Sequence, residues 1–338
     1  MSKSAPNTGV QLNNHSMGAL ALALTLAISA PASAASGPLR VDSANAARGV
    51  QSVTIGAFNV GFIFESVDNT KASGGMIGAF GGTSRAKSML VGVTPAMMQA
   101  ITDAAYADFQ AQLQARGFVV ASNAQLFAAP DFGRVKAMAS PYEAGVKLDK
   151  KSNGKATYYK PSSLPKQFML PNDIVSSGMS GMGLTMAAGT NQYAVSQFAK
   201  SSGQAVLDVI YLIDFSDVKR PGAFSMGGLQ VSSGMAVVDD YSKLKLISPR
   251  GGVTTITVEQ PISVAGDFAT KQDVTKDAAL QSAANVAGGV AAAFGFGGMR
   301  MGKSKTFTFY AKPEYQAGAV KAASLANARL LDQLAALR

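Results

Sequence analysis

The apolar positions along this chain follow two periods, and the shorter period predicts strands. Residues 50–65 (VQSVTIGAFNVGFIFE) largely alternate between apolar and polar after a break at Gly56, and residues 305–311 (KTFTFYA) alternate in the same way. Residues 206–215 (VLDVIYLIDF) are almost continuously apolar, which is typical of a strand buried on both faces. Residues 252–264 are rich in β-branched side chains and therefore predict a further strand.

The longer period predicts a helix that begins at Pro95, with Thr94 as its N-cap, and ends at Gly117. The apolar residues 118–120 follow at once and predict a strand, so this segment forms a β-helix-β unit with residues 50–65. The helix should pack on a sheet through one apolar stripe, made of Met98, Ile101, Ala105, Phe109 and Leu113.

The carboxy-terminal half predicts two more helices and a hairpin. Residues 192–200 predict a short helix capped by Thr190, and residues 236–247 predict a hairpin that turns at residues 239–240. Residues 312–338 predict a closing helix. Its heptad-like face contains Val320, Ala323, Leu330, Leu334 and Leu337, with Asn327 in the same stripe.

This order of elements predicts an α/β fold with a mixed sheet and packed helices. We expect a single main domain at residues 51–312, with Gly/Met-rich and Lys-rich insertions, followed by a carboxy-terminal helix at residues 313–338. A flexible amino-terminal tail at residues 35–50 should precede the domain. Residues 123–190 show little regular pattern.

The first 34 residues have the layout of a cleavable signal peptide. An apolar run at residues 19–30 follows a polar leader that carries Lys3, and small residues (PASAA) come next. The run is shorter than the about 20 apolar residues that span a bilayer. Cleavage after Ala34 would place the mature chain in the periplasm or at the outer membrane. The chain has no cysteine, so a lipoprotein signal is excluded.

Composition narrows the possible chemistry. Cleavage would remove the only histidine, His15, leaving a mature chain with neither His nor Cys and a net charge of +9, since +10 loses Lys3. Ser-His-Asp and Cys-His triads are therefore excluded, as are the usual zinc, haem and iron-sulfur ligand sets. Charged residues make up 15% of the chain, below the about 25% of ordinary soluble proteins. Such a surface favours contact with a membrane, a polymer or other subunits.

Two short motifs match catalytic patterns without the context that those patterns need. Residues 297–304 (GGMRMGKS) fit a phosphate-binding loop, but a strand is predicted after them where that loop needs a helix. Ser84 and Ser216 each begin an S-x-x-K pattern, yet the S-D-N and K-T-G partners of that enzyme family do not occur. We therefore predict no catalytic residue, no nucleotide site and no cofactor.

A cluster of lysines predicts contact with polyanions. Tyr158 and Tyr159 lie within it, an arrangement that suits nucleic acid in the cytoplasm, but export excludes that partner. Anionic lipid or a cell-wall polymer then becomes the candidate, and a solvated loop is the alternative. The candidate polyanion-binding residues are Lys147, Lys150, Lys151, Lys155, Lys160 and Lys166.

Methionines provide one alternative for metal binding. Met179, Met182 and Met186 lie in a Gly/Ser-rich setting, and thioethers are soft ligands that select Cu(I). Methionine is also an adaptable apolar residue of contact surfaces, and we favour that interpretation.

The order of strands and helices resembles a group of envelope proteins. The helix end at residues 112–117, the strand at residues 118–120 and the apolar strand at residues 207–214 are similar to the periplasmic domain of the curli-secretion channel family and to the amino-terminal domain of the Tol-Pal translocation protein. The resemblance implies a periplasmic or outer-membrane-associated protein. It does not extend to the lipidated cysteine of the curli channel or to the closing helix.

These observations predict an exported, non-catalytic binding or assembly component of the cell envelope. Its expected partners are envelope proteins or further copies of the chain. A hydrolase that acts on cell wall or lipid without His or Cys is the alternative, and a methionine-based Cu(I)-binding protein is a further one.

Overall fold

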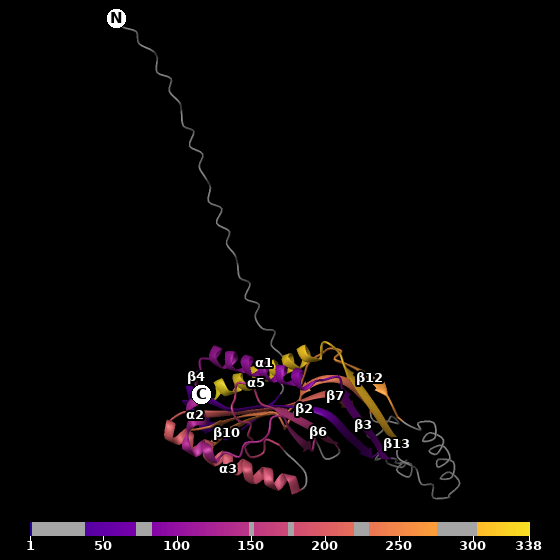
Figure 1. The fold of residues 1–338 in the computed structure, drawn as a ribbon, viewed down its shortest axis with the longest axis horizontal. Helices are drawn as coiled ribbons and strands as arrows, with labels where there is room; N and C mark the ends of the chain where they lie inside the picture. The colour runs from indigo at the N-terminus through magenta and orange to yellow at the C-terminus, as the bar shows by residue number, and fades with distance from the viewer. Residues whose placement is uncertain (2–37, 72–82, 149–151, 175–178, 220–229, 276–302) are drawn as a thin grey trace, which may run out of the picture. The chain divides into compact units, whose positions relative to one another are not determined.

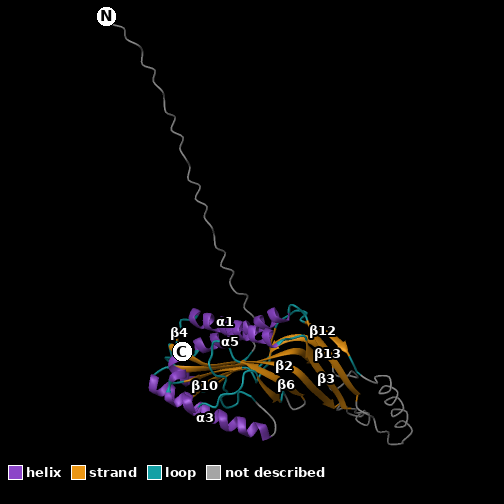
Figure 2. Cartoon of the chain, in the orientation of Figure 1, coloured by secondary structure: helices purple, strands orange, loops and turns teal. Residues whose placement is uncertain are grey.

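The predicted α/β class is confirmed by the computed structural model of the chain, in whose described residues one mixed sheet of thirteen strands carries helices on both faces (Figures 1 and 2). The elements belong to one compact unit, Ser36–Arg338. The structure describes Met1 and residues 38–71, 83–148, 152–174, 179–219, 230–275 and 303–338.

Eight strands form the main path of the sheet. In spatial order they are β1 (Leu39–Asp42), β10 (Val253–Val258), β9 (Lys243–Ile247), β7 (Ala205–Lys219), β2 (Ser52–Lys71), β3 (Thr83–Val91), β13 (Lys303–Ala311) and β12 (Ala269–Asp273). The others pair beside it: β4 (Val119–Ala121) and β6 (Ser152–Tyr159) with β2, β5 (Tyr142–Val146) with β6, β8 (Gln230–Val237) with β7, and β11 (Ile262–Ser263) with β8.

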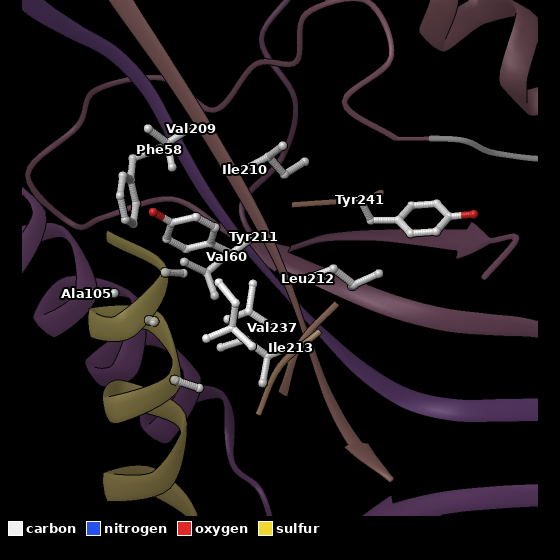
Figure 3. Close-up of a cluster of buried hydrophobic side chains, with 14 of the residues drawn as sticks. Phe58, Val60, Ala105, Val209, Ile210, Tyr211, Leu212, Ile213, Val237 and Tyr241 are labelled. Atoms are coloured by element: carbon white, nitrogen blue, oxygen red, sulfur yellow. The ribbon is translucent and has the colours of Figure 1, made fainter. Parts of the chain in front are cut away.

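The long strands β2 and β7 run parallel at the centre of the sheet and carry much of the core (Figure 3). Their pairing shifts register between Ile55 and Ala57, so the break predicted at Gly56 is a β-bulge. A Cβ atom at Gly56 would lie 2.7 Å from a Val206 methyl carbon. Because that distance is below any real contact, the bulge requires glycine here.

Helix α1 (Pro95–Ala115) confirms the predicted start, end and buried stripe. The Thr94 hydroxyl accepts a hydrogen bond from the Met97 amide at 3.2 Å, and Gly117 adopts φ +78° after the last turn. The Phe109 ring lies 5.5 Å from that of Phe58, which in turn lies 5.6 Å from Tyr211 on β7. All five stripe residues are buried: Met98, Ile101, Ala105, Phe109 and Leu113.

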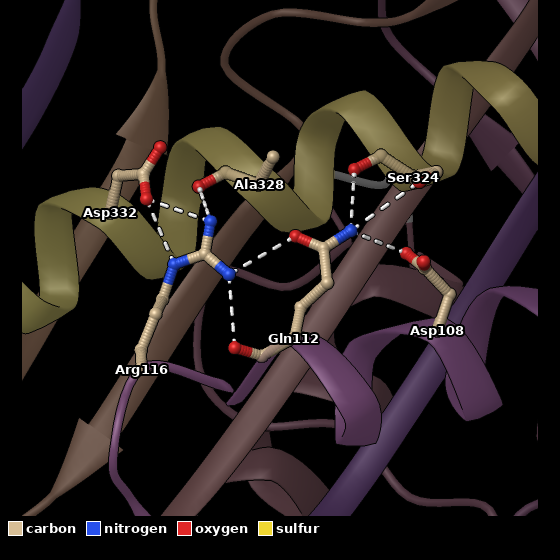
Figure 4. Close-up of polar contacts among 6 residues, drawn as sticks. All are labelled: Asp108, Gln112, Arg116, Ser324, Ala328 and Asp332. Carbon is tan, nitrogen blue, oxygen red and sulfur yellow. Dashed lines mark hydrogen bonds and ion pairs between the residues drawn. The ribbon is translucent and has the colours of Figure 1, made fainter. Parts of the chain in front are cut away.

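Helix α5 (Tyr315–Ala336), the predicted closing helix, packs along α1 on the same face of the sheet (Figure 4). Arg116 pairs with Asp332 at 2.7 Å and donates to the Ala328 carbonyl, while Gln112 donates to the Ser324 carbonyl at 3.2 Å. The heptad-like face is thus used within the unit: Ala323, Leu330 and Leu334 are buried, and Val320 and Leu337 are partly buried.

The hairpin predicted at residues 236–247 is wrong. Both β8 and β9 run antiparallel to β7, on the edge opposite β2, one after the other. The chain does turn at residues 239–241, but this turn does not pair β8 with β9. Between the two strands, the Ser242 hydroxyl accepts a hydrogen bond from the Leu212 amide of β7. The hairpin partner of β9 is β10.

The segments with little pattern hold more structure than expected. The helix predicted at residues 192–200 is longer, α3 (Met179–Ser202), and the expected cap Thr190 lies inside it, donating to the Met186 carbonyl. Glycine and serine in its first half conceal the helical period. The sequence also did not predict the β5–β6 hairpin or three short helices: η1 (Ala44–Ala47), α2 (Ala124–Ala128) and η3 (Pro130–Arg134). Because β1 and η1 lie within residues 35–50, the flexible tail expected there is wrong.

Candidate functional site

Three pairs of neighbouring strands end at the same end of the sheet (Figure 1). Strand β2 runs parallel to β7 and antiparallel to β3, while β13 is parallel to β3 and antiparallel to β12. Strand β8 starts where β7 stops. We call this the hairpin end, defined by the strand termini Lys71, Thr83, Lys219, Gln230, Asp273 and Lys303.

The sequences that join these strand pairs have a shared character. Residues 72–82, 220–229 and 276–302 lie outside the described residues, but their composition is rich in Gly, Ala and Met, and residues 72–82 carry no charge. The topology therefore brings three weakly charged connections, far apart in sequence, to one end of the sheet. No single stretch of the sequence could reveal that convergence.

The structure separates the four candidate lysines that it describes. Lys155 lies on β6 opposite Gly145 of β5, and Lys147 follows β5, so both are exposed on one face of this hairpin. Lys160 is partly buried and donates to the Pro161 carbonyl. Lys166 is also partly buried, with its ammonium 5.7 Å from the centre of the Phe132 ring. Lys150 and Lys151 lie outside the described residues.

The aromatic residues of the lysine segment do not form a stacking surface. The Tyr158 and Tyr159 side chains are 0% and 4% exposed and belong to the core. Burial raises the pKa of Tyr159, and the nearby charge of Glu143 adds to the effect. Lys147 and Lys155 are therefore the described part of the cluster that can meet a polyanion.

The candidate methionines lie on the first half of α3. Met182 and Met186 are one helical turn apart and each 70% exposed, and Met179 is the first residue of the helix. Tyr193, 53% exposed, continues the same stripe toward the end of the helix. Two exposed thioethers on one face suit a soft metal ion, and they equally suit an apolar contact surface.

A buried charge network ties the loop after residue 170 to the sheet. The Lys245 ammonium contacts the Asp173 carboxylate, lies 3.6 Å from Asp208 and donates to the Pro171 carbonyl at 2.8 Å. Burial, with the negative charge of Asp173, raises the pKa of Asp208 well above its usual value. Burial alone would lower the pKa of Lys245, but the two carboxylates outweigh it and raise that pKa. This network has little access to solvent.

Among the pockets on the described surface, one has a volume of about 280 Å³ and another of about 460 Å³. Ser43 and Ser248 line the first, and Thr255 and Thr257 line the second. In neither pocket does one of these hydroxyls hydrogen-bond to a lysine amine or a carboxylate, the contact that activates a nucleophile.

The two motif matches fall on strands. Lys303 and Ser304 begin β13, as expected from the alternation after them; the first six residues of that motif are not described. In the S-x-x-K segments, Lys87 pairs with Glu65 at 3.2 Å, and the Ser216 hydroxyl donates to Asp214 at 3.2 Å. Local strand contacts therefore occupy these side chains.

Among the described helices, none combines the length and apolar character needed to cross a membrane. Within the same residues, no cluster of three or more His, Cys, Asp or Glu side chains is placed to bind a metal ion. Comparison of the chain with family models, with curated proteins and with solved structures found no match.

Proposed function

We propose that this protein is an exported, non-catalytic binding or assembly component of the cell envelope, and that it assembles through the hairpin end. The convergence of three weakly charged connections at one end of the sheet supports this proposal. Sequences with few charges and many apolar residues are typical of sites that contact other molecules. Its partners are further copies of the chain or another envelope protein.

The helices that cover the two faces of the sheet suit a rigid support for the hairpin end. Helices α1 and α5 cover one face, and α3 packs on the other face with its last three turns. Strands β3, β12 and β13 lie toward the hairpin end, away from α2 and α3 (Figure 2). Export is supported by the layout of the first 34 residues.

Two charges placed in the uncharged connection, residues 72–82, test the proposal. We expect Ile77→Asp with Phe80→Asp to convert an assembly in envelope extracts into a monomer, because carboxylates are expensive to bury in an apolar contact. Sedimentation velocity in mild detergent measures the change. Ala104→Asp with Ala111→Asp, at exposed positions of α1, is the matched control and should leave the assembly intact.

The same preparation tests export. Amino-terminal sequencing of the fractionated protein should begin near Ala35. A full-length chain in the cytoplasm would contradict the envelope location, and equal sedimentation of the wild type and the Ile77/Phe80 variant would contradict assembly at the hairpin end.

A further inference from the structure

The larger pocket lies on the α3 side of the sheet, over β1, β9 and β10. Strand β9 alternates between two faces: Leu244 and Leu246 enter the core below α5, while Lys243 and Lys245 point the other way into the pocket. The turn at Pro171 and Asn172 and the side chain of Gln192 from α3 complete the wall. This site lies apart from the hairpin end.

The strand register arranges the polar residues of this pocket in two rows. Asp42, Thr255, Lys245 and Asp208 stand opposite one another on four neighbouring strands, so the first row holds two carboxylates and one ammonium. Arg40, Thr257 and Lys243 make the second row on β1, β10 and β9. Directly paired residues place their side chains on the same face of a sheet about 5 Å apart, so the second row carries two cations with a hydroxyl between them.

Lys243 is the unusual member of the second row. It is 7% exposed, and its ammonium donates one hydrogen bond, to the Asn172 carbonyl at 2.7 Å. No described carboxylate lies within 4.0 Å of it, whereas Lys245 next to it has two. Burial lowers the pKa of Lys243 and the charge of Lys245 adds to this, against the attraction of Asp173 and Asp208. A buried cation normally has an anionic partner.

The other two members of the row can supply the remaining donors. Thr257 is 2% exposed and lines the pocket, and its hydroxyl has no hydrogen-bond partner among the described residues. Arg40 lies at the rim and contacts the carboxylates of Asp42, Asp240 and Glu259 at 3.4 to 3.7 Å. These exposed pairs contribute little, so the guanidinium can exchange one of them for a ligand.

We propose that Arg40, Thr257 and Lys243 bind an oxyanion of the phosphate class. A guanidinium presents a fork of donors that matches a tetrahedral oxyanion, and the hydroxyl and the ammonium donate to its other oxygens. The bound anion supplies the partner that Lys243 lacks. A free phosphate and the phosphate group of a lipid share this chemistry, and the experiment separates them.

The first arm of the test uses inorganic phosphate. Isothermal titration should show saturable binding of phosphate by the full chain. Potassium chloride at equal ionic strength should not displace the phosphate. Loss of one charge-assisted contact weakens binding by about tenfold, so we expect that loss for Lys243→Met and for Arg40→Gln. Thr257→Val should weaken binding less, and Lys321→Gln, at an exposed position of α5, is the control.

The second arm uses sedimentation with vesicles of phosphatidylglycerol. A lipid source predicts that Lys243→Met reduces vesicle binding and that inorganic phosphate competes, while a free-phosphate source predicts equal vesicle binding by the variant. Arg40 is exposed, so the Arg40→Gln variant keeps its fold and decides the result if Lys243→Met does not fold. Equal phosphate affinity of wild type and Arg40→Gln, or no binding by wild type at millimolar phosphate, overturns the proposal.

Discussion

At the residue scale, Asp214 links the stability of the sheet to pH. Its carboxylate accepts from both the amide and the hydroxyl of Ser216, at a register shift between β7 and β8. Burial nevertheless raises the pKa of Asp214 to about 6, from 3.8. The folded state therefore holds a proton between about pH 4 and pH 6 that the unfolded chain releases.

This difference fixes the sign of the pH dependence. Because the folded state binds more protons in that window, the free energy of unfolding falls as pH rises from about 4 to about 6, by at most about 3 kcal/mol. We expect Asp214→Asn to remove most of this fall. Urea unfolding at pH 4, 5, 6 and 7 measures it, with the partly exposed Asp131→Asn as control. An unchanged slope in Asp214→Asn would assign the pH dependence to other groups.

At the element scale, the sequence predicted α1 by its cap, strands by their alternation and the parallel pairing of β2 with β4, but it did not predict most of the other contacts between elements. Thr94 and Gly117 could be assigned to the ends of α1 because capping hydrogen bonds and positive φ angles depend on residues that are close in the sequence. Asn327 looked like a flaw in an apolar stripe, yet it is buried, accepts from the Tyr211 hydroxyl and donates to the Ala105 carbonyl. Its partners lie more than a hundred positions away, beyond any periodic pattern.

The contribution of the packing between α1 and the sheet to the free energy of unfolding can be measured. Phe109 is fully buried beside Phe58, so we expect Phe109→Ala to lower the free energy of unfolding by about 3 to 5 kcal/mol through lost transfer energy and the cavity left behind. Denaturant unfolding at constant pH measures it. Gln114→Ala, at an exposed position of the same helix, should change it by less than about 0.5 kcal/mol. Similar values for the two variants would contradict the packing described.

At the scale of the whole molecule, the candidate sites were predictable only in part. The lysine segment could be found by composition. Which of its lysines are exposed on the β5–β6 hairpin, and which are partly buried in the loop after it, depends on the fold. The two polar rows could not be found, because Arg40, Lys243 and Thr257 come from strands that only the fold brings together. The hairpin end was missed for the same reason.

Polyanion binding by the lysine segment makes a separate prediction. We expect Lys150→Gln, Lys151→Gln and Lys155→Gln together to abolish sedimentation with anionic vesicles at 0.1 M salt, where charges are screened beyond about 10 Å. Stability should change little, since exposed charges contribute little to folding. The control removes the same charge elsewhere, at the exposed positions Lys136, Lys200 and Lys321. Equal vesicle binding by both triple variants would leave the segment as solvated surface.

The pairing of β1 has a consequence for when this sheet can form. Leu39 pairs with Val258, and the central strand β2 takes β7 as its parallel partner. Contacts between such distant parts of a chain close slowly, because the intervening loop must lose its entropy first. In a nascent chain β1 therefore cannot pair until residues 253–258, which form β10, have been synthesised. Delayed closure would keep the polypeptide threadable through a narrow pore, which is the state that the proposed export requires.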